Sequence, residues 1–251
     1  MTSENNYLIL GCSHSMGSYE WANSDDKSKQ KIGCDETWVK YSKSWEHYLK
    51  IEDAKSITSI AFPGEGYSMW AQFLTLMDKL GELKHFDKII IQETFEPRTS
   101  FINEKGVLWE ILNGFRGCCR FKTGKVHKII FSTDEGCTSL DYGINLRLAH
   151  VGADVMPKYE KLYEDTCTSS LHDWIVPLCM DKVVSVLKKN NITGYTFSFH
   201  ENHLKEYLTN IKDEVYQLIT DSDKNFKADT NGHLTDSGQR YLAKVLQKEM
   251  K

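Results

Sequence analysis

The sequence predicts an α/β protein built on a parallel sheet, because short apolar segments alternate with amphipathic ones along its first part. Residues 7–10 and 89–91 are continuous apolar runs, which are typical of strands buried on both faces. Residues 56–61 alternate and are rich in β-branched side chains, which favours a further strand. Helical periodicity separates these segments, and the order strand, helix, strand, helix, strand is that of a parallel sheet.

The first part of the chain supports this prediction element by element. Residues 23–36 are polar and charged and predict a surface loop, and aromatic residues at near-helical spacing then predict an amphipathic helix over 37–51. Residues 62–68 contain two glycines and predict a turn. The turn leads into a helix whose apolar residues run from Met69 to Leu80 and which Gly81 closes. Residues 86–94 form the predicted third strand.

The remainder of the chain predicts a fourth and a fifth strand, over 128–132 and 192–199. Residues 107–115 are expected to be helical and 116–128 to be a connection, and 140–189 predict two or three helices broken near Pro157 and Pro177. Residues 204–220 predict another amphipathic helix, and 235–250 a terminal helix that Thr235 or Asp236 caps. We find no repeat or linker, so we expect one domain over 1–251, with an insertion or extra helices around 97–190.

Composition limits the classes of partner. The formal net charge of -4 leaves no basic footprint for nucleic acid. No apolar run approaches the ~20 residues that cross a bilayer, and residues 1–6 lack the features of a secretory signal. The seven cysteines are odd in number and have no Cys-x-x-Cys spacing, which favours reduced thiols. We therefore expect a cytoplasmic protein without a nucleic-acid or membrane partner; release or incorporation in a particle stays open.

The segment from Gly11 to Gly17 is the first candidate site, because the apolar strand stops there at a glycine followed by Cys12, Ser13 and His14. Ligands of parallel α/β proteins bind at the carboxyl ends of strands, so Ser13 is a candidate nucleophile. The alternative is that Ser13 only caps the next helix, since serine is a preferred N-cap.

A nucleophilic serine needs a base, and His233 lies in a turn-rich loop just before the last helix. Asp229 lies four positions earlier and could orient that imidazole. Donors for a developing oxyanion would be the backbone N–H groups of Ser13 and of Gly64 or Gly66, with a side chain at the end of the third strand. Ordinary loop and turn chemistry is the alternative for each of these residues.

Three blocks in this order resemble the SGNH (GDSL-like) hydrolase family. The first is Gly11 to Ser15, the second is residues 61–68, and the third is residues 232–238 followed by 240–243. The family's aspartate before the serine is Cys12 here, and its Gly-x-Asn-Asp block is replaced by residues 92–95. The family's acid lies two or three residues before the histidine, and Asp229 is one residue further away.

The resemblance implies a flavodoxin-like, three-layer α/β/α sandwich with a parallel sheet of about five strands. It also implies a serine esterase without a cofactor that acts on a small-molecule or glycan ester. An O-acetyl group on a carbohydrate is the expected substrate, as for family members encoded by phages and bacteria. In this hypothesis Ser13 attacks the acyl carbon, His233 transfers the proton and Asp229 orients His233. The oxyanion donors are Ser13, Gly64 and a side chain, Gln92 or Thr94.

Other residues have weaker signals. His14, Gly66 and Arg98 are candidate substrate contacts, although Arg98 could instead pair with Glu96. Residues 200–203 contain two histidines and a glutamate that could ligate a metal, but without further ligands a solvated loop is favoured, and no metal is expected. The altered third-strand block and the distant acid favour an alternative function, a non-catalytic binding or structural module. A third hypothesis is that residues 12–17 form a phosphate-binding loop for a nucleotide or flavin. This segment lacks the P-loop lysine and the Gly-x-Gly-x-x-Gly pattern.

Overall fold

A parallel sheet forms the centre of the protein. The computed structural model describes residues 4–15, 17, 43–61, 67–93, 117–132, 138–139, 145–146, 169–200, 203–227 and 233–250. Within these ranges the main sheet has the strand order β4-β5-β2-β1-β3-β8-β9. All of its neighbouring strands run parallel except β4, which pairs antiparallel with β5 at one edge. The expected parallel sheet is confirmed, with six parallel strands rather than about five.

The strands have the following bounds: β1 (Asn5–Gly11), β2 (Ala54–Ala61), β3 (Lys88–Glu93), β4 (Gly117–Thr123), β5 (Val126–Ser132), β8 (Thr193–Ser198) and β9 (Thr209–Lys212). A separate small pair consists of β6 (Thr138–Ser139) and β7 (Asn145–Leu146). The predicted strands over 7–10, 56–61, 86–94, 128–132 and 192–199 therefore correspond to β1, β2, β3, β5 and β8. Strand β1 lies between β2 and β3 and is central in the sheet.

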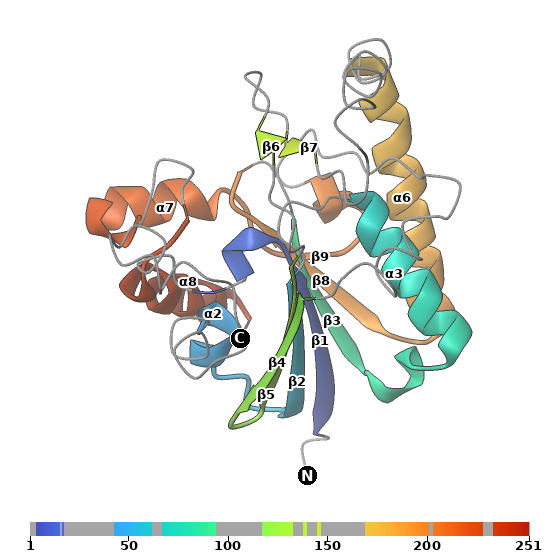
Figure 1. Ribbon diagram of the computed structural model, residues 1–251, viewed down its shortest axis with the longest axis horizontal. Helices are drawn as coiled ribbons and strands as arrows, with labels where there is room; N and C mark the ends of the chain where they lie inside the picture. Colours follow the sequence, from blue (N-terminus) through green and yellow to red (C-terminus); the bar gives the residue numbers. More distant parts are fainter. Residues whose placement is uncertain are drawn as a thin grey trace.

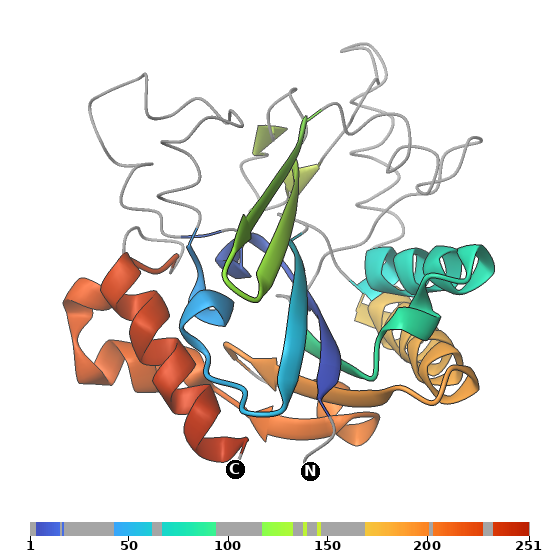
Figure 2. The same ribbon diagram turned by 90° about the horizontal axis from the view of Figure 1, so that it is seen from below.

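Helices cover both faces of the sheet, which makes the expected three-layer α/β/α arrangement (Figures 1 and 2). One face carries α2 (Trp45–Tyr48), α7 (Val215–Ser222) and α8 (Asp236–Glu249). The other face carries α3 (Tyr67–Leu80) and α6 (Ser169–Lys189). Short 3-10 helices are η1 (Ser13–Ser15), η2 (Leu83–His85), η3 (His203–Glu206) and η4 (Lys224–Phe226). No helix in the described ranges is long and apolar enough to cross a membrane.

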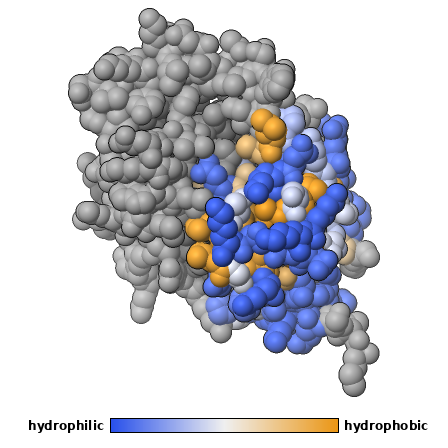
Figure 3. Space-filling model, turned by 90° about the vertical axis from the view of Figure 1, so that its right-hand side faces the viewer, coloured by the Kyte–Doolittle hydropathy of each residue, from blue (hydrophilic) through white to orange (hydrophobic). Residues whose placement is uncertain are grey.

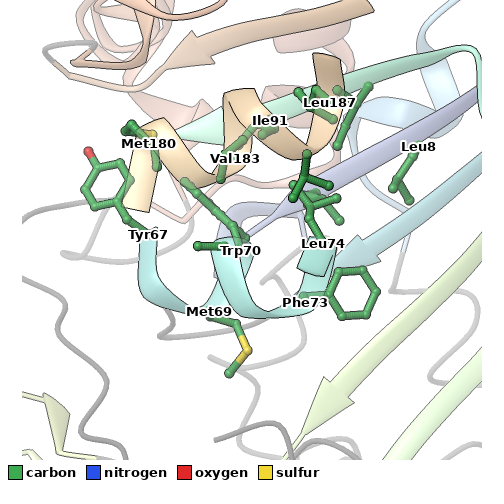
Figure 4. Packing of buried hydrophobic residues seen from close by; sticks show 14 of the residues in the cluster. Leu8, Tyr67, Met69, Trp70, Phe73, Leu74, Ile91, Met180, Val183 and Leu187 are labelled. Carbon is green, nitrogen blue, oxygen red and sulfur yellow. The ribbon is translucent and has the colours of Figure 1, made fainter. Parts of the chain in front are cut away.

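The alternation of side chains along β1 explains the continuous apolar run of its sequence. Leu8 and Leu10 join the core beneath α3 and α6, whereas Tyr7 and Ile9 join the core on the opposite face. The first core also contains Trp70, Leu74, Met180, Val183 and Leu187 (Figure 4). The second contains Trp45, Phe197, Ile219, Leu242 and Leu246. On the side of the molecule that carries α3 and α6, hydrophilic side chains predominate on the described surface, with apolar side chains exposed between them (Figure 3).

A polar network lies where β1 begins. The carboxylate of Asp53 accepts hydrogen bonds from Asn5 Nδ2 at 2.6 Å, Tyr7 Oη at 2.9 Å and Lys88 Nζ at 2.6 Å. Burial and the adjacent Asp53 raise the pKa of Tyr7 to about 12, although Lys88 acts in the opposite direction. Burial would raise the pKa of Asp53, but its hydrogen bonds outweigh burial and lower it. The network joins the three central strands at their amino ends, opposite the candidate site.

Two elements differ from the sequence prediction because strand pairing overrides local pattern. Residues 117–123, predicted as a connection, form β4, which turns back onto β5 at Gly124, where the backbone φ of +61° suits glycine. The predicted helix over 204–220 is instead η3, β9 and α7. The middle of this segment, β9, pairs with β8. Glu214, between β9 and α7, has a positive φ of 51°.

Two helix predictions are also wrong in their extent. The expected break near Pro177 does not occur: α6 continues through the exposed Pro177, held against the sheet by buried Met180 and Val183. The helix expected over 37–51 is described only from residue 43, and there it begins after Ser44 and ends at Tyr48. The helix predicted from Met69 to Leu80 is confirmed as α3, which begins two residues earlier, and Gly81 after it has a positive φ of 72°. Of the two predicted caps of α8, Thr235 is the N-cap. The predicted helix over 107–115 and Pro157 lie outside the described residues.

Candidate functional site

The segment after β1 turns back tightly over the end of the strand. Residues 13–15 form η1, and the Ser15 N–H donates to the Cys12 carbonyl at 3.0 Å. A Cβ atom on Gly11 would lie only 2.2 Å from Ser15 Oγ and 2.4 Å from Ser15 Cβ. The close approach of Ser15 therefore requires glycine at position 11. The result is that Ser13 follows the central strand directly, at the carboxyl end of the sheet.

A buried hydrogen-bond chain holds this turn. The Ser15 hydroxyl donates to Gln92 Oε1 and accepts from the indole Nε1 of Trp45, at 2.9 Å. Gln92 Nε2 in turn lies 3.1 Å from the Cys12 sulfur, to which it donates. Gln92, Ser15 and Trp45 are fully buried. Both ends of the Gln92 amide are thus engaged with the turn, and Gln92 links the end of β3 to the end of β1.

Gln239 of α8 makes a second set of buried contacts with the same turn. Its Oε1 accepts the backbone N–H of Trp45 at 3.0 Å. Its Nε2 donates to the backbone carbonyls of His14 at 3.0 Å and Gly17 at 3.1 Å. Gln239 thereby connects α8, the start of α2 and the turn after β1. Figure 1 shows this turn, the short blue helix at the end of β1, on the side of the sheet covered by α2 and α8.

His14 and His233 lie against each other. Their ring centroids are 5.0 Å apart with an interplanar angle of 35°, and the His14 ring also stacks on Phe199, with the centroids 4.3 Å apart. His14 is 1% exposed, whereas His233 is half-buried. The structure thus brings His233 to the residue next to Ser13. His14 is thus buried between His233 and Phe199, and its expected contact with substrate stays a prediction.

A buried carboxylate follows Gln92 at the end of β3. Glu93 is 2% exposed, accepts a hydrogen bond from the Tyr67 hydroxyl and lies 3.5 Å from the Leu204 N–H. Tyr67 is the first residue of α3 and follows the predicted glycine turn. Glu93 therefore ties the start of α3 to the end of β3, beside the turn that carries Ser13.

The start of α8 has its own charged contacts. Asp236 accepts hydrogen bonds from the Tyr48 hydroxyl and from Arg240 Nε at 2.8 Å, and the Arg240 guanidinium lies over the Tyr48 ring. Burial acts to raise the pKa of Asp236, but these hydrogen bonds and the guanidinium outweigh it and lower the pKa. Asp236 is therefore ionised at neutral pH and holds α8 to α2 close to His233.

The structure brings together four of the residues predicted for the site. The Ser13 backbone, His14, Gln92 and His233 gather at the carboxyl end of β1 and β3. The Ser13 side chain and all of Gly64, Gly66, Thr94, Arg98 and Asp229 lie outside the described residues. Their predicted roles stay predictions.

The histidine segment after β8 gives no metal site within the described residues. His200 packs against the Tyr216 ring at 5.2 Å, and burial lowers its pKa. No group of three or more His, Cys, Asp or Glu residues in the described ranges is arranged to hold a metal ion. Glu201 and Asn202 lie outside the described residues, so the loop interpretation of this segment stays a prediction.

Sequence reasoning missed the supporting residues Ser15, Trp45 and Gln239. Gln239 had a recognisable signal: it precedes Leu242, Ala243 and Leu246 at helical spacing, and so it occupies the buried face of an amphipathic helix. A polar side chain in such a position needs hydrogen-bond partners. Nothing in the sequence could say that these partners belong to the turn after β1.

Neither a protein-family model nor a curated protein matches this chain.

Proposed function

We propose that this protein is a serine esterase of SGNH type, and that its substrate is an ester such as an O-acetyl group on a carbohydrate. The observation that carries this proposal is the contact between His14, the neighbour of Ser13, and His233, whose ring centroids are 5.0 Å apart. Nucleophilic acyl transfer by a serine needs a base close to its hydroxyl, and this contact brings a histidine to the residue next to Ser13. The sequence blocks support the same function.

In the proposed mechanism, the Ser13 hydroxyl attacks the acyl carbon while His233 takes its proton. His233 then returns this proton to the leaving alcohol, and the acyl group stays bonded to Ser13. A water molecule, deprotonated by His233, attacks the acyl carbon and releases the acid and free Ser13. Asp229 orients the imidazole. The reaction needs no cofactor.

The oxyanion donors in this mechanism are the backbone N–H groups of Ser13 and Gly64. Gln92 is better suited to hold the turn than to donate to substrate, because it is buried and contacts Ser15 and Cys12 through both ends of its amide. We therefore assign the side-chain donor to Thr94, two residues further along. Loss of one such donor typically lowers kcat by about 10²–10³-fold.

A second candidate function is a non-catalytic binding or structural module with the same fold. It is favoured by the engagement of Gln92 with the turn, at the strand end where related hydrolases present an asparagine donor. Such a module would keep the packing of the turn without turnover.

Hydrolysis assays on the purified protein separate the two functions. The substrates are a chromogenic acetyl ester and a panel of O-acetylated glycans, with acetate release as the readout. We expect Ser13→Ala and His233→Ala to lower kcat by at least about 10³-fold. The controls Ser222→Ala and His85→Ala, at exposed positions, should retain wild-type activity. Turnover no faster than that of Ser13→Ala on every ester would refute the esterase and favour the binding module.

A further inference from the structure

We propose that Gln239 is a positioning residue for this reaction: its buried amide fixes the Ser13 turn relative to the helix that follows His233. The inference rests on the proposed function. It assigns a role in catalysis to a side chain that need not touch the reacting atoms. It is carried by the hydrogen bonds of Gln239, by its complete burial and by the short connection from His233 to α8.

All the principal hydrogen-bonding groups of the Gln239 amide are used. A primary amide offers a carbonyl acceptor and two N–H donors. The carbonyl accepts from the backbone of Trp45, and the two donors go to the carbonyls of His14 and Gly17. The two carbonyls stand on either side of Ser15, so the amide holds the turn at two points.

A glutamine is the side chain that these partners select. A carboxylate at position 239 would accept from Trp45 but would face two carbonyl oxygens without a proton to donate. An apolar side chain would leave a buried N–H and two carbonyls without their contacts, which is costly in a dry interior. Trp45 completes the arrangement, since its backbone is held by Gln239 while its indole donates to Ser15.

The main chain of His233 is tied to α8 by short contacts. Leu234 is fully buried and forms an isolated antiparallel β-bridge with Lys227. The Thr235 N–H donates to the Phe226 carbonyl at 2.9 Å. Thr235 Oγ1 then accepts from the Gly238 N–H and caps α8. A shift of α8 relative to the turn after β1 would therefore change the separation of Ser13 and His233. A misplacement of about 1 Å in a catalytic pair costs about 10²-fold in rate.

Gln239→Met and Gln239→Glu test the proposal, with Gln247→Met as the matched control. Gln247 lies on the same helix, and its Oε1 accepts the Lys50 N–H at 3.4 Å, away from the turn. Methionine keeps the length of the side chain and removes its hydrogen bonds. We expect kcat per folded molecule to fall about 10²-fold in Gln239→Met with KM unchanged, and Gln247→Met to behave as wild type.

The pH profile separates positioning from mere stability. At neutral pH the carboxylate of Gln239→Glu lacks both donors, whereas a protonated carboxyl group accepts from Trp45 and donates to one carbonyl. The ratio of its kcat/KM to that of wild type should therefore rise as the pH falls. This ratio is taken per folded molecule, with the folded fraction measured at each pH, because a buried carboxylate also makes stability depend on pH. A purely structural role would lower the folded fraction in both Gln239 variants but leave kcat/KM per folded molecule equal to that of wild type at every pH. If Gln239→Met does not fold, Gln239→Glu alone decides the question.

Hydrogen exchange of the backbone amides supplies a readout that does not need turnover. The Trp45 and Ser15 amides should exchange faster in Gln239→Met than in wild type, and at the wild-type rate in Gln247→Met. Faster exchange together with an inactive wild-type protein would refute the esterase and leave Gln239 as the residue that fixes the turn. Unchanged exchange, or an unchanged kcat in an active protein, would overturn the role of Gln239 and leave the esterase intact.

Discussion

Replacing Gly11 by alanine should strain the turn after β1, because the added methyl group has no room. Its position lies 2.2 Å from Ser15 Oγ and 2.4 Å from Ser15 Cβ, well inside contact distance, and the nearest Gln92 atom is 3.1 Å away. Ser15 must move, and it then loses its hydrogen bonds with Gln92 and Trp45. The perturbation acts on the folded site without removing any side chain from it.

The size of the effect follows from these contacts. Overpacking in a close-packed interior costs about 1–3 kcal/mol, and the two displaced hydrogen bonds add about 1 kcal/mol each. The reduced freedom of alanine in the unfolded chain offsets about 0.4–1 kcal/mol of this cost. We expect the free energy of unfolding of Gly11→Ala to fall by about 2–5 kcal/mol.

Urea unfolding followed by circular dichroism and tryptophan fluorescence measures this difference. The informative comparison is a double-mutant cycle with Ser15→Gly, which removes both atoms that clash with the new methyl group. Gly11→Ala should then cost at least about 1 kcal/mol less than in the wild-type background. Gly124→Ala is the control for backbone strain alone, since its φ is +61° but no atom lies within 4 Å of the added Cβ. Equal costs of Gly11→Ala in both backgrounds would refute the steric reasoning.

Two further predictions concern stability away from the site. Hydrogen bonds from Lys88 and other donors outweigh burial and lower the pKa of Asp53 below its ordinary value of 3.8. The Asp53 carboxylate therefore stabilises the fold above pH 3.8, and this stabilisation is lost as the pH falls through the pKa of the folded state. In Asp53→Asn the urea midpoint should therefore fall less steeply at acid pH than in wild type. The exposed control Asp181→Asn should keep the wild-type slope. An unchanged slope in Asp53→Asn would contradict this. Pro177→Ala should raise the free energy of unfolding by about 1–3 kcal/mol, because proline is unfavourable inside α6. Leu178→Ala, at an exposed position of the same helix, is the control. If Pro177→Ala does not stabilise the protein in thermal unfolding, α6 accommodates the proline without strain.

The strands that were predicted correctly share a physical cause. Strands β1 and β3 are buried on both faces, so every side chain in their centres must be apolar, and the run is visible without knowledge of any neighbour. Helices α3 and α8 each bury one face. Gly81 marks the end of α3, and Thr235 marks the start of α8. These signals are local, and local signals are what a single sequence contains.

The elements that were predicted wrongly depend on partners. Strand β9 sits at a sheet edge, and it is a strand only because β8 supplies hydrogen bonds along it. Strand β4 is held in the same way by β5. Continuation of α6 through Pro177 depends on the packing of its neighbours Met180 and Val183 beneath α3. In each case tertiary contacts outweigh a local preference.

The candidate site divides along the same line. The sequence by itself determined that Ser13 follows a buried strand and that His233 precedes the last helix, because both statements concern residues adjacent to strong local patterns. Only the tertiary structure decided that His14 meets His233, that Gln92 holds the turn, and that Gln239 reaches it from 225 positions away along the chain. Hydrogen bonds between such distant residues depend on how the sheet and its helices pack. The partners of a buried polar side chain are therefore set by the fold rather than by its neighbours in sequence.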